Sequence, residues 1–146
     1  GFYVKEGNPK NIQRFEDLLR EDVRMSNREK GSGIRIFSDE MCKKLDIDPD
    51  RIHGYEDIAS SHLIAATNVL RGTADVAIGN EKSARQMEGI QFLPLKQESY
   101  DIVFRKKDLK RKEFQNLLNI IGSEEFQKEA EMMSGYDISD MGKQLY

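Results

Sequence analysis

The chain has 146 residues, enough for one folded domain with its own hydrophobic core. Its 23 basic and 26 acidic side chains give a formal net charge of −3, which excludes a globally basic nucleic-acid binder. No apolar run approaches the roughly 20 residues that a membrane-spanning helix needs, so we expect no membrane partner. The single cysteine, Cys42, allows no intrachain disulfide and fits a reduced, cytoplasmic setting.

The first residue is a glycine, and the apolar residues directly after it predict a strand that begins at once. Neither an initiator methionine nor a charged and then apolar leader stands before this strand. We therefore expect the segment to come from a longer protein.

Strands and helices are expected to alternate along the chain. Short apolar runs predict strands at residues 2–4, 23–26, 55–58, 74–78, 92–95 and 100–104. Helical spacing of apolar residues, with caps and breakers, predicts helices at about 12–20, 34–45, 61–70, 80–87, 111–121 and 123–133. The strand cores are apolar rather than alternating, which favours an α/β fold whose mainly parallel sheet is flanked by helices.

Three predicted loops lead from a strand into a helix, at residues 27–33, 60–62 and 79–81. The carboxyl ends of parallel strands lie at one edge of a sheet, and ligands bind there, where the helices begin. We therefore expect the functional residues at this edge.

The clearest local pattern is the glycine-containing loop NREKGSG, which leads directly into the second helix. Its glycines let consecutive N–H groups turn toward one ligand, and the helix adds free amides and the positive end of its dipole. The loop is not a Walker P-loop, because the Gly-Lys-Ser/Thr ending is absent. The alternative is an ordinary turn in which Ser32 caps the helix. The residues expected to bind a ligand here are Asn27, Arg28, Gly31, Ser32, Gly33, Ile34 and Arg35.

The other two helix starts carry weaker patterns. Ser61 and His62 offer a hydroxyl and an imidazole to the same ligand, and Asn80 offers an amide. The alternatives are that Ser61 and Asn80 are helix caps and that His62 is an ordinary first-turn histidine. Glu81 would repel an anion, so we expect it to serve the helix dipole.

The sequence contains no pattern that predicts nucleic-acid binding, catalysis or a metal site. The basic run at residues 105–112 lacks interleaved aromatic residues and is interpreted as a solvated helix entrance, so no nucleic acid is expected to bind this segment. There is no G-x-S-x-G elbow and no HExxH motif, and Cys42 lies inside a predicted helix without a nucleophile signature. We therefore expect no catalytic residue, no metal site and no cofactor.

Several motifs, taken in order, resemble a single family. The residues that carry the resemblance are Phe2-Tyr3-Val4, Gly7-Asn8-Pro9-Lys10, Asn27-Arg28, Gly31-Ser32-Gly33, Arg35, Gly54-Tyr55, His62, Gly72, Ala74-Asp75, Phe92-Leu93-Pro94-Leu95 and Tyr100-Asp101. They resemble the cytoplasmic periplasmic-binding-protein-like domain. That domain occurs fused to molybdenum-insertion proteins of molybdopterin biosynthesis, and behind helix-turn-helix domains in regulators similar to molybdate-responsive ones.

The resemblance implies a two-lobed, type 2 binding-protein fold with the ligand between the lobes. Residues 1–146 then form a single partial domain, with the second lobe at 5–97 and a return crossing and closing helices at 98–146.

The family pattern usually has threonine after Gly-Ser-Gly, whereas this chain has Ile34. The missing hydroxyl would remove a hydrogen bond of roughly 0.5–1.5 kcal/mol to an oxyanion.

The function implied is a ligand-sensing module that binds a small anion such as molybdate or tungstate in a molybdenum-cofactor-related protein. One alternative is the effector domain of a helix-turn-helix regulator, and another is an assembly module with a degenerate pocket. Without the first lobe, the closing helices would leave an apolar stripe uncovered, so we expect a homodimer.

Overall fold

The computed structural model describes residues 1–133 and 135–144. These residues form two compact units, Gly1–Lys96 and Gln97–Tyr146. The sheet and the first three α-helices belong to the first unit, and the last two α-helices belong to the second.

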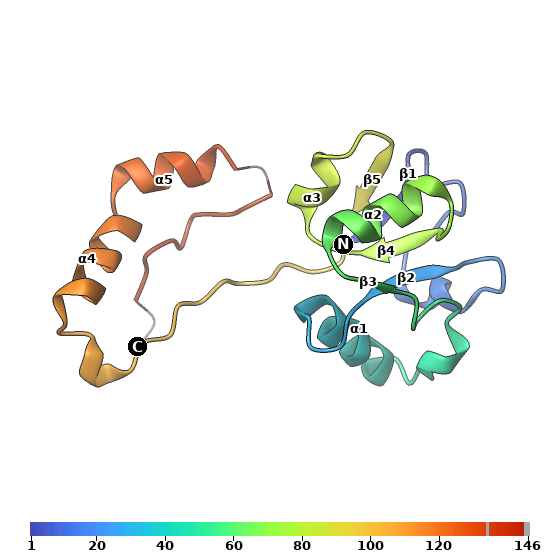
Figure 1. Ribbon diagram of the computed structural model, residues 1–146, viewed down its shortest axis with the longest axis horizontal. Helices are drawn as coiled ribbons and strands as arrows, with labels where there is room; N and C mark the ends of the chain where they lie inside the picture. The colour runs from blue at the N-terminus through green and yellow to red at the C-terminus, as the bar shows by residue number, and fades with distance from the viewer. Residues whose placement is uncertain (134, 145–146) are drawn as a thin grey trace. The chain divides into compact units, whose positions relative to one another are not determined.

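The first unit is built on a five-stranded sheet in the order β3-β2-β4-β1-β5 (Figure 1). The strands are β1 (Phe2–Lys5), β2 (Met25–Arg28), β3 (Ile58–Ala59), β4 (Val76–Ile78) and β5 (Ile90–Leu93). β2 pairs in parallel with β3 and β4, whereas β1 runs antiparallel to its neighbours β4 and β5. Four of the five strands therefore point the same way, which confirms the expected α/β fold with a mainly parallel sheet.

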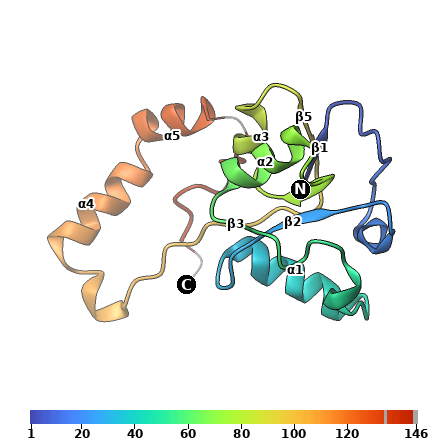
Figure 2. The same cartoon turned by 45° about the vertical axis from the view of Figure 1, so that its right-hand side comes forward.

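Helices cover both faces of this sheet. α1 (Gly33–Lys44) lies on one face, and α2 (His62–Arg71) and α3 (Glu81–Arg85) lie on the other (Figures 1 and 2). Because side chains alternate along a strand, Phe2 and Val4 join the core under α1, whereas Tyr3 joins the core under α2. The α2 side is built largely from alanines, whose small side chains let that helix pack close to the sheet.

The prediction of a helix at about residues 12–20 is corrected by the structure. The structure has only the 3-10 helix η1 (Phe15–Leu19) there. Asn8 and Asn11 both have positive φ, and the Asn8 side chain accepts from the amide of Ile12 and donates to its carbonyl. The Asp17 carboxylate accepts from the amides of Gln13 and Arg14. These side-chain bonds compete with the helical ladder and hold the segment in turns.

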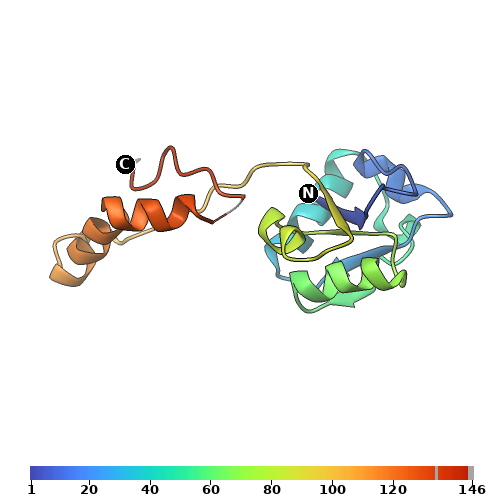
Figure 3. The ribbon, with the colours of Figure 1, turned by 90° about the horizontal axis from the view of Figure 1, so that it is seen from above.

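The second unit contains the 3-10 helix η3 (Lys106–Asp108), α4 (Lys112–Ile121) and α5 (Glu124–Glu131), as Figure 3 shows. Both predicted closing helices are therefore present. The strand predicted at 100–104 is wrong, because that segment has no regular structure. A strand needs a partner for its backbone hydrogen bonds, and the described part of this unit contains no other strand. Among the described helices, none is long and apolar enough to cross a membrane.

Candidate ligand site

Three strand-to-helix junctions meet at one edge of the sheet. β2, β3 and β4 are parallel, so their carboxyl ends lie together, and each leads into a helix. The expectation that loops 27–33, 60–62 and 79–81 share an edge is thereby confirmed. At each start a side-chain oxygen of Ser32, Ser61 or Asn80 accepts from an amide of the first turn. These oxygens cap helices, as the alternative interpretation held, and α3 is too short to add a strong dipole.

The loop before α1 leaves its backbone open. Gly31 has a φ of +93°, a conformation that side-chain-bearing residues rarely adopt. No atom lies within 4 Å of the Cβ position of either Gly31 or Gly33, and both glycines are exposed. Within the described residues no acceptor bonds the amides of Gly33 and Ile34. The start of α1 therefore presents free donors to solvent, whereas the Ile34 side chain packs against the core.

Arg28 ends β2 with a largely buried guanidinium. Its Nε donates to the Ala59 carbonyl at 2.9 Å, and its Nη2 reaches the Ser60 carbonyl at 3.5 Å. The same two nitrogens donate to the two carboxylate oxygens of Glu29, each at 2.9 Å. The side chain of Arg28 is 10% exposed and that of Glu29 is 44% exposed. The planar fork of a largely buried arginine is therefore occupied by a carboxylate of the same chain.

Two buried polar atoms near these junctions lack a hydrogen-bond partner. Asn27 is fully buried, and its Nδ2 is unpartnered while its Oδ1 accepts from the Arg28 amide. His62 begins α2, and its Nδ1 is also buried and unpartnered. Burial lowers the pKa of His62, and the nearby Arg28 lowers it further. The imidazole is therefore neutral at pH 7, and both groups have hydrogen-bonding capacity that a ligand can use.

Arg35 lies on the other face of the sheet from Arg28. Its guanidinium stacks 4.6 Å from the centre of the Tyr55 ring. It also pairs with the carboxylates of Asp39 and Glu56. One of its nitrogens, Nη1, is buried without a partner. The two arginines that the sequence grouped together share no partner, and we leave Arg35 out of the ligand set proposed below.

Sequence reasoning missed Glu29 as a site residue. It treated this position as part of a polar loop, and neighbouring residues in a strand normally point to opposite faces. The sequence does place a glutamate directly after an arginine at the end of a strand. Beyond the strand end, side chains no longer alternate between the two faces, so these two can pair. Tyr3 is a second omission, because its hydroxyl donates to the Asn80 carbonyl at 2.6 Å and its ring leaves no room for a side chain at Gly79.

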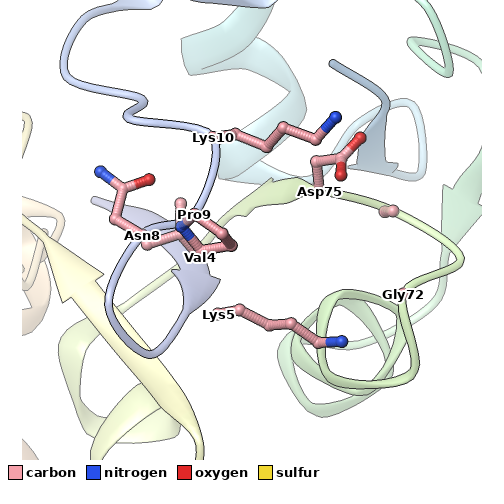
Figure 4. Close-up of a pocket in the computed structure, with 8 residues that line it drawn as sticks. Val4, Lys5, Asn8, Pro9, Lys10, Gly72 and Asp75 are labelled. Atoms are coloured by element: carbon pink, nitrogen blue, oxygen red, sulfur yellow. The ribbon is translucent and has the colours of Figure 1, made fainter. Parts of the chain in front are cut away.

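Two hollows of the first unit are lined by other residues than Asn27, Arg28, Gly33, Ile34 and His62. One of about 180 Å³ sits at the opposite edge, where β1 ends and β4 begins (Figure 4). There Lys10 bonds to Asp22, and the Asp75 carboxylate accepts from the Arg24 amide. Another, of about 290 Å³, lies between α3 and β5 beside the ion pair of Glu81 and Arg85. Neither hollow is lined by a buried, unpartnered polar atom like those of Asn27 and His62, so we place the candidate site at these residues.

Metal binding has little support in this part of the molecule. In residues 1–133 and 135–144, no group of three or more His, Cys, Asp or Glu side chains is arranged to hold an ion. The candidate site consists instead of hydrogen-bond donors at one sheet edge.

A family model described as a PBP superfamily domain matches residues 1–122. The chain belongs to the PBP superfamily. The periplasmic-binding-protein-like fold implied by the resemblance is therefore supported, and the domain is a ligand-binding module by family. The molybdenum-related context is not part of that match.

Two relatives have similar sequences. The chain is 41% identical over 143 residues to the uncharacterized protein YvgK of Bacillus subtilis (strain 168), covering 98% of this chain and 46% of that protein. It is 44% identical over 108 residues to an uncharacterized protein of Clostridium pasteurianum named for its place in the 5′ region of a 2Fe-2S ferredoxin gene. That match covers 74% of this chain and 96% of the relative. The chain thus spans about half the length of the Bacillus relative. No solved structure matches it with statistical significance.

Proposed function

We propose that this domain binds a small oxyanion, such as molybdate or tungstate, where β2 and β3 lead into α1 and α2. The observation that carries the proposal is a largely buried arginine fork close enough to His62 to lower its pKa, with buried, unpartnered polar atoms on His62 and on Asn27, the residue before Arg28. His62 begins α2, and Asn27 and Arg28 end the strand that leads into the loop before α1. The dipole of a helix favours negative charge at its start. The amides of Gly33 and Ile34, to which no acceptor of the described residues bonds, add further donors.

The ligand chemistry follows from the kind of groups present. Arg28, Asn27 Nδ2 and the backbone amides can only donate, so they require a ligand rich in acceptor oxygens. A neutral His62 supplies a donor from its protonated nitrogen and gains a proton when negative charge arrives. The Ile34 side chain offers no hydroxyl, so the site lacks one hydrogen bond of roughly 0.5–1.5 kcal/mol that a threonine would supply.

The context we propose is a molybdenum-cofactor-related protein, with the effector domain of a helix-turn-helix regulator as the rival context. In either one the unit Gly1–Lys96 would be the second lobe of a two-lobed fold and the domain itself non-catalytic and cytoplasmic.

Isothermal titration of the purified domain with molybdate, tungstate, sulfate and phosphate tests the proposal. Binding of at least one of these anions, accompanied by a rise in melting temperature with its concentration, is expected. Sodium chloride at matched ionic strength is the control, because a specific site responds to the anion rather than to screening. The absence of binding at millimolar anion would contradict the proposal.

A second candidate function, assembly, is favoured by the apolar side chains that α4 and α5 keep exposed. Leu117, Leu118, Ile120 and Phe126 are each between 37% and 54% exposed. Soluble domains rarely leave such a stripe uncovered unless it binds a partner.

A further inference from the structure

We propose that Glu29 sets the affinity of the oxyanion site by holding Arg28 in the empty domain, so that an incoming oxyanion must displace the Glu29 carboxylate. This inference rests on the proposed oxyanion function and concerns a residue that neither the sequence pattern nor the comparisons assign to it.

The geometry first explains why Glu29 is there. A largely buried guanidinium without an acceptor is costly, because water cannot replace the missing partner. Both Glu29 oxygens lie 2.9 Å from nitrogens of Arg28, the side-by-side arrangement that a carboxylate and a guanidinium prefer. A bound oxyanion would use the same arrangement and the same two nitrogens. Ligand and Glu29 therefore compete for Arg28.

The structure also shows how Glu29 can leave. Its side chain is 44% exposed, so the carboxylate can turn into water with little loss of solvation. Its backbone stays in place, because the Glu29 carbonyl accepts from the Ser32 amide at 3.1 Å. Arg28 in contrast keeps its bond to the Ala59 carbonyl and remains fixed. Displacement is then a rotation of one side chain, with no change to the loop before α1.

Glu29 is also close enough to influence the next helix. Its negative charge raises the pKa of His62, against the larger lowering by burial and by Arg28. An oxyanion that takes its place restores a negative charge beside the same two groups. Because sulfate and molybdate are dianions and the displaced Glu29 stays on the loop, the exchange adds negative charge beside Arg28 and His62 and should raise the pKa of His62.

The experiment compares Glu29→Gln with the wild-type domain by calorimetric titration with sulfate and molybdate. The amide keeps the shape of the side chain but loses the charge that competes for Arg28, so the dissociation constant should fall about three- to tenfold. Glu40→Gln is the matched control: it makes the same charge change at an exposed position on α1. That variant should stay within about twofold of the wild type.

The outcomes separate this inference from the proposed function. If the wild type binds an anion and Glu29→Gln binds it no more tightly, Glu29 does not compete and the inference fails alone. If both glutamine variants gain the same affinity for the anion, the gain comes from the change in net charge and the inference also fails. If no variant binds any anion, the proposed function fails with it. Melting curves of the ligand-free variants serve as the second readout: anion should raise the melting temperature of Glu29→Gln more than that of the wild type.

Discussion

Arg28 is the side chain on which the candidate site most depends. Its planar fork bonds the Ala59 carbonyl and two carboxylate oxygens at once, a pattern that a lysine ammonium cannot reproduce. We expect Arg28→Lys to weaken oxyanion binding by roughly tenfold or more, measured by calorimetric titration. The control is Arg24→Lys, which changes an exposed arginine just before β2 and should leave binding within about twofold. Equal losses in the two variants would contradict a specific role for Arg28.

His62 gives the free energy of unfolding a pH dependence of known sign. Its pKa in the folded domain is lowered, first by burial and then by Arg28, below the ordinary value of about 6.5. The unfolded chain therefore binds a proton more readily, so the stability that is full above about pH 6.5 declines as the pH falls toward the folded-state pKa. His62→Gln should show a shallower decline than wild type in urea unfolding between about pH 7 and 5.

The control for this prediction is His53→Gln, which makes the same substitution at an exposed position outside the candidate site. The His62 imidazole signal in proton NMR offers a direct check, because its midpoint should lie below that of an exposed histidine. A bound anion should move the midpoint upward. A midpoint that stays unchanged at saturating anion would place the ligand away from His62.

At the scale of elements, the loop before α1 contains two glycines that look equivalent in sequence and differ in structure. Gly31 has a φ of +93°, whereas Gly33 is the first residue of α1 with an ordinary φ, and neither has a neighbour within 4 Å of its Cβ position. Alanine at 31 should lower the free energy of unfolding by about 1 kcal/mol, because L residues are strained there. Alanine at 33 should leave it unchanged or raise it by about 0.5 kcal/mol, since alanine favours helices.

Urea denaturation of the two single variants checks this difference. Each serves as the control for the other, because the added methyl group meets open space at both positions. If both variants lose the same stability, the positive φ at Gly31 does not decide the loop conformation.

Caps and periodicity made most elements predictable. Ser32 and Ser61 cap the starts of α1 and α2, as the alternative interpretation of these serines held, and the parallel strands bring the three loops to one edge. The segment before β2 could not be predicted in this way, since hydrogen bonds from Asn8 and Asp17 replace the helical ladder there. The sequence predicted at which edge of the sheet the candidate site lies, but not which side chains pair with each other there. Whether Arg28 faces Glu29 depends on the chain direction after β2, which no periodicity encodes.

At the scale of the whole molecule, the order of the sheet explains why one edge alone collects the helix starts. β1 runs against the other four strands, so its carboxyl end lies at the edge opposite the candidate site. The free helix N-termini and the polar ends of β2 and β3 are thereby segregated from the hollow beside Lys5 and Asp75 (Figure 4). This separation supports the anion preference that we propose for that edge.

We further propose that the chain associates as a homodimer through α4. On this helix Leu117 and Leu118 remain 39% and 37% exposed, and burying such side chains in a two-fold contact would remove apolar surface from water. Light scattering at micromolar concentration should give the mass of two chains for the wild type. Leu118→Glu should shift the mass toward one chain, because the carboxylate would be buried without a partner. Asn116→Glu adds the same charge at an exposed, polar position of α4 and should keep the dimer. A wild-type mass of one chain, or equal dissociation in both variants, would contradict this contact.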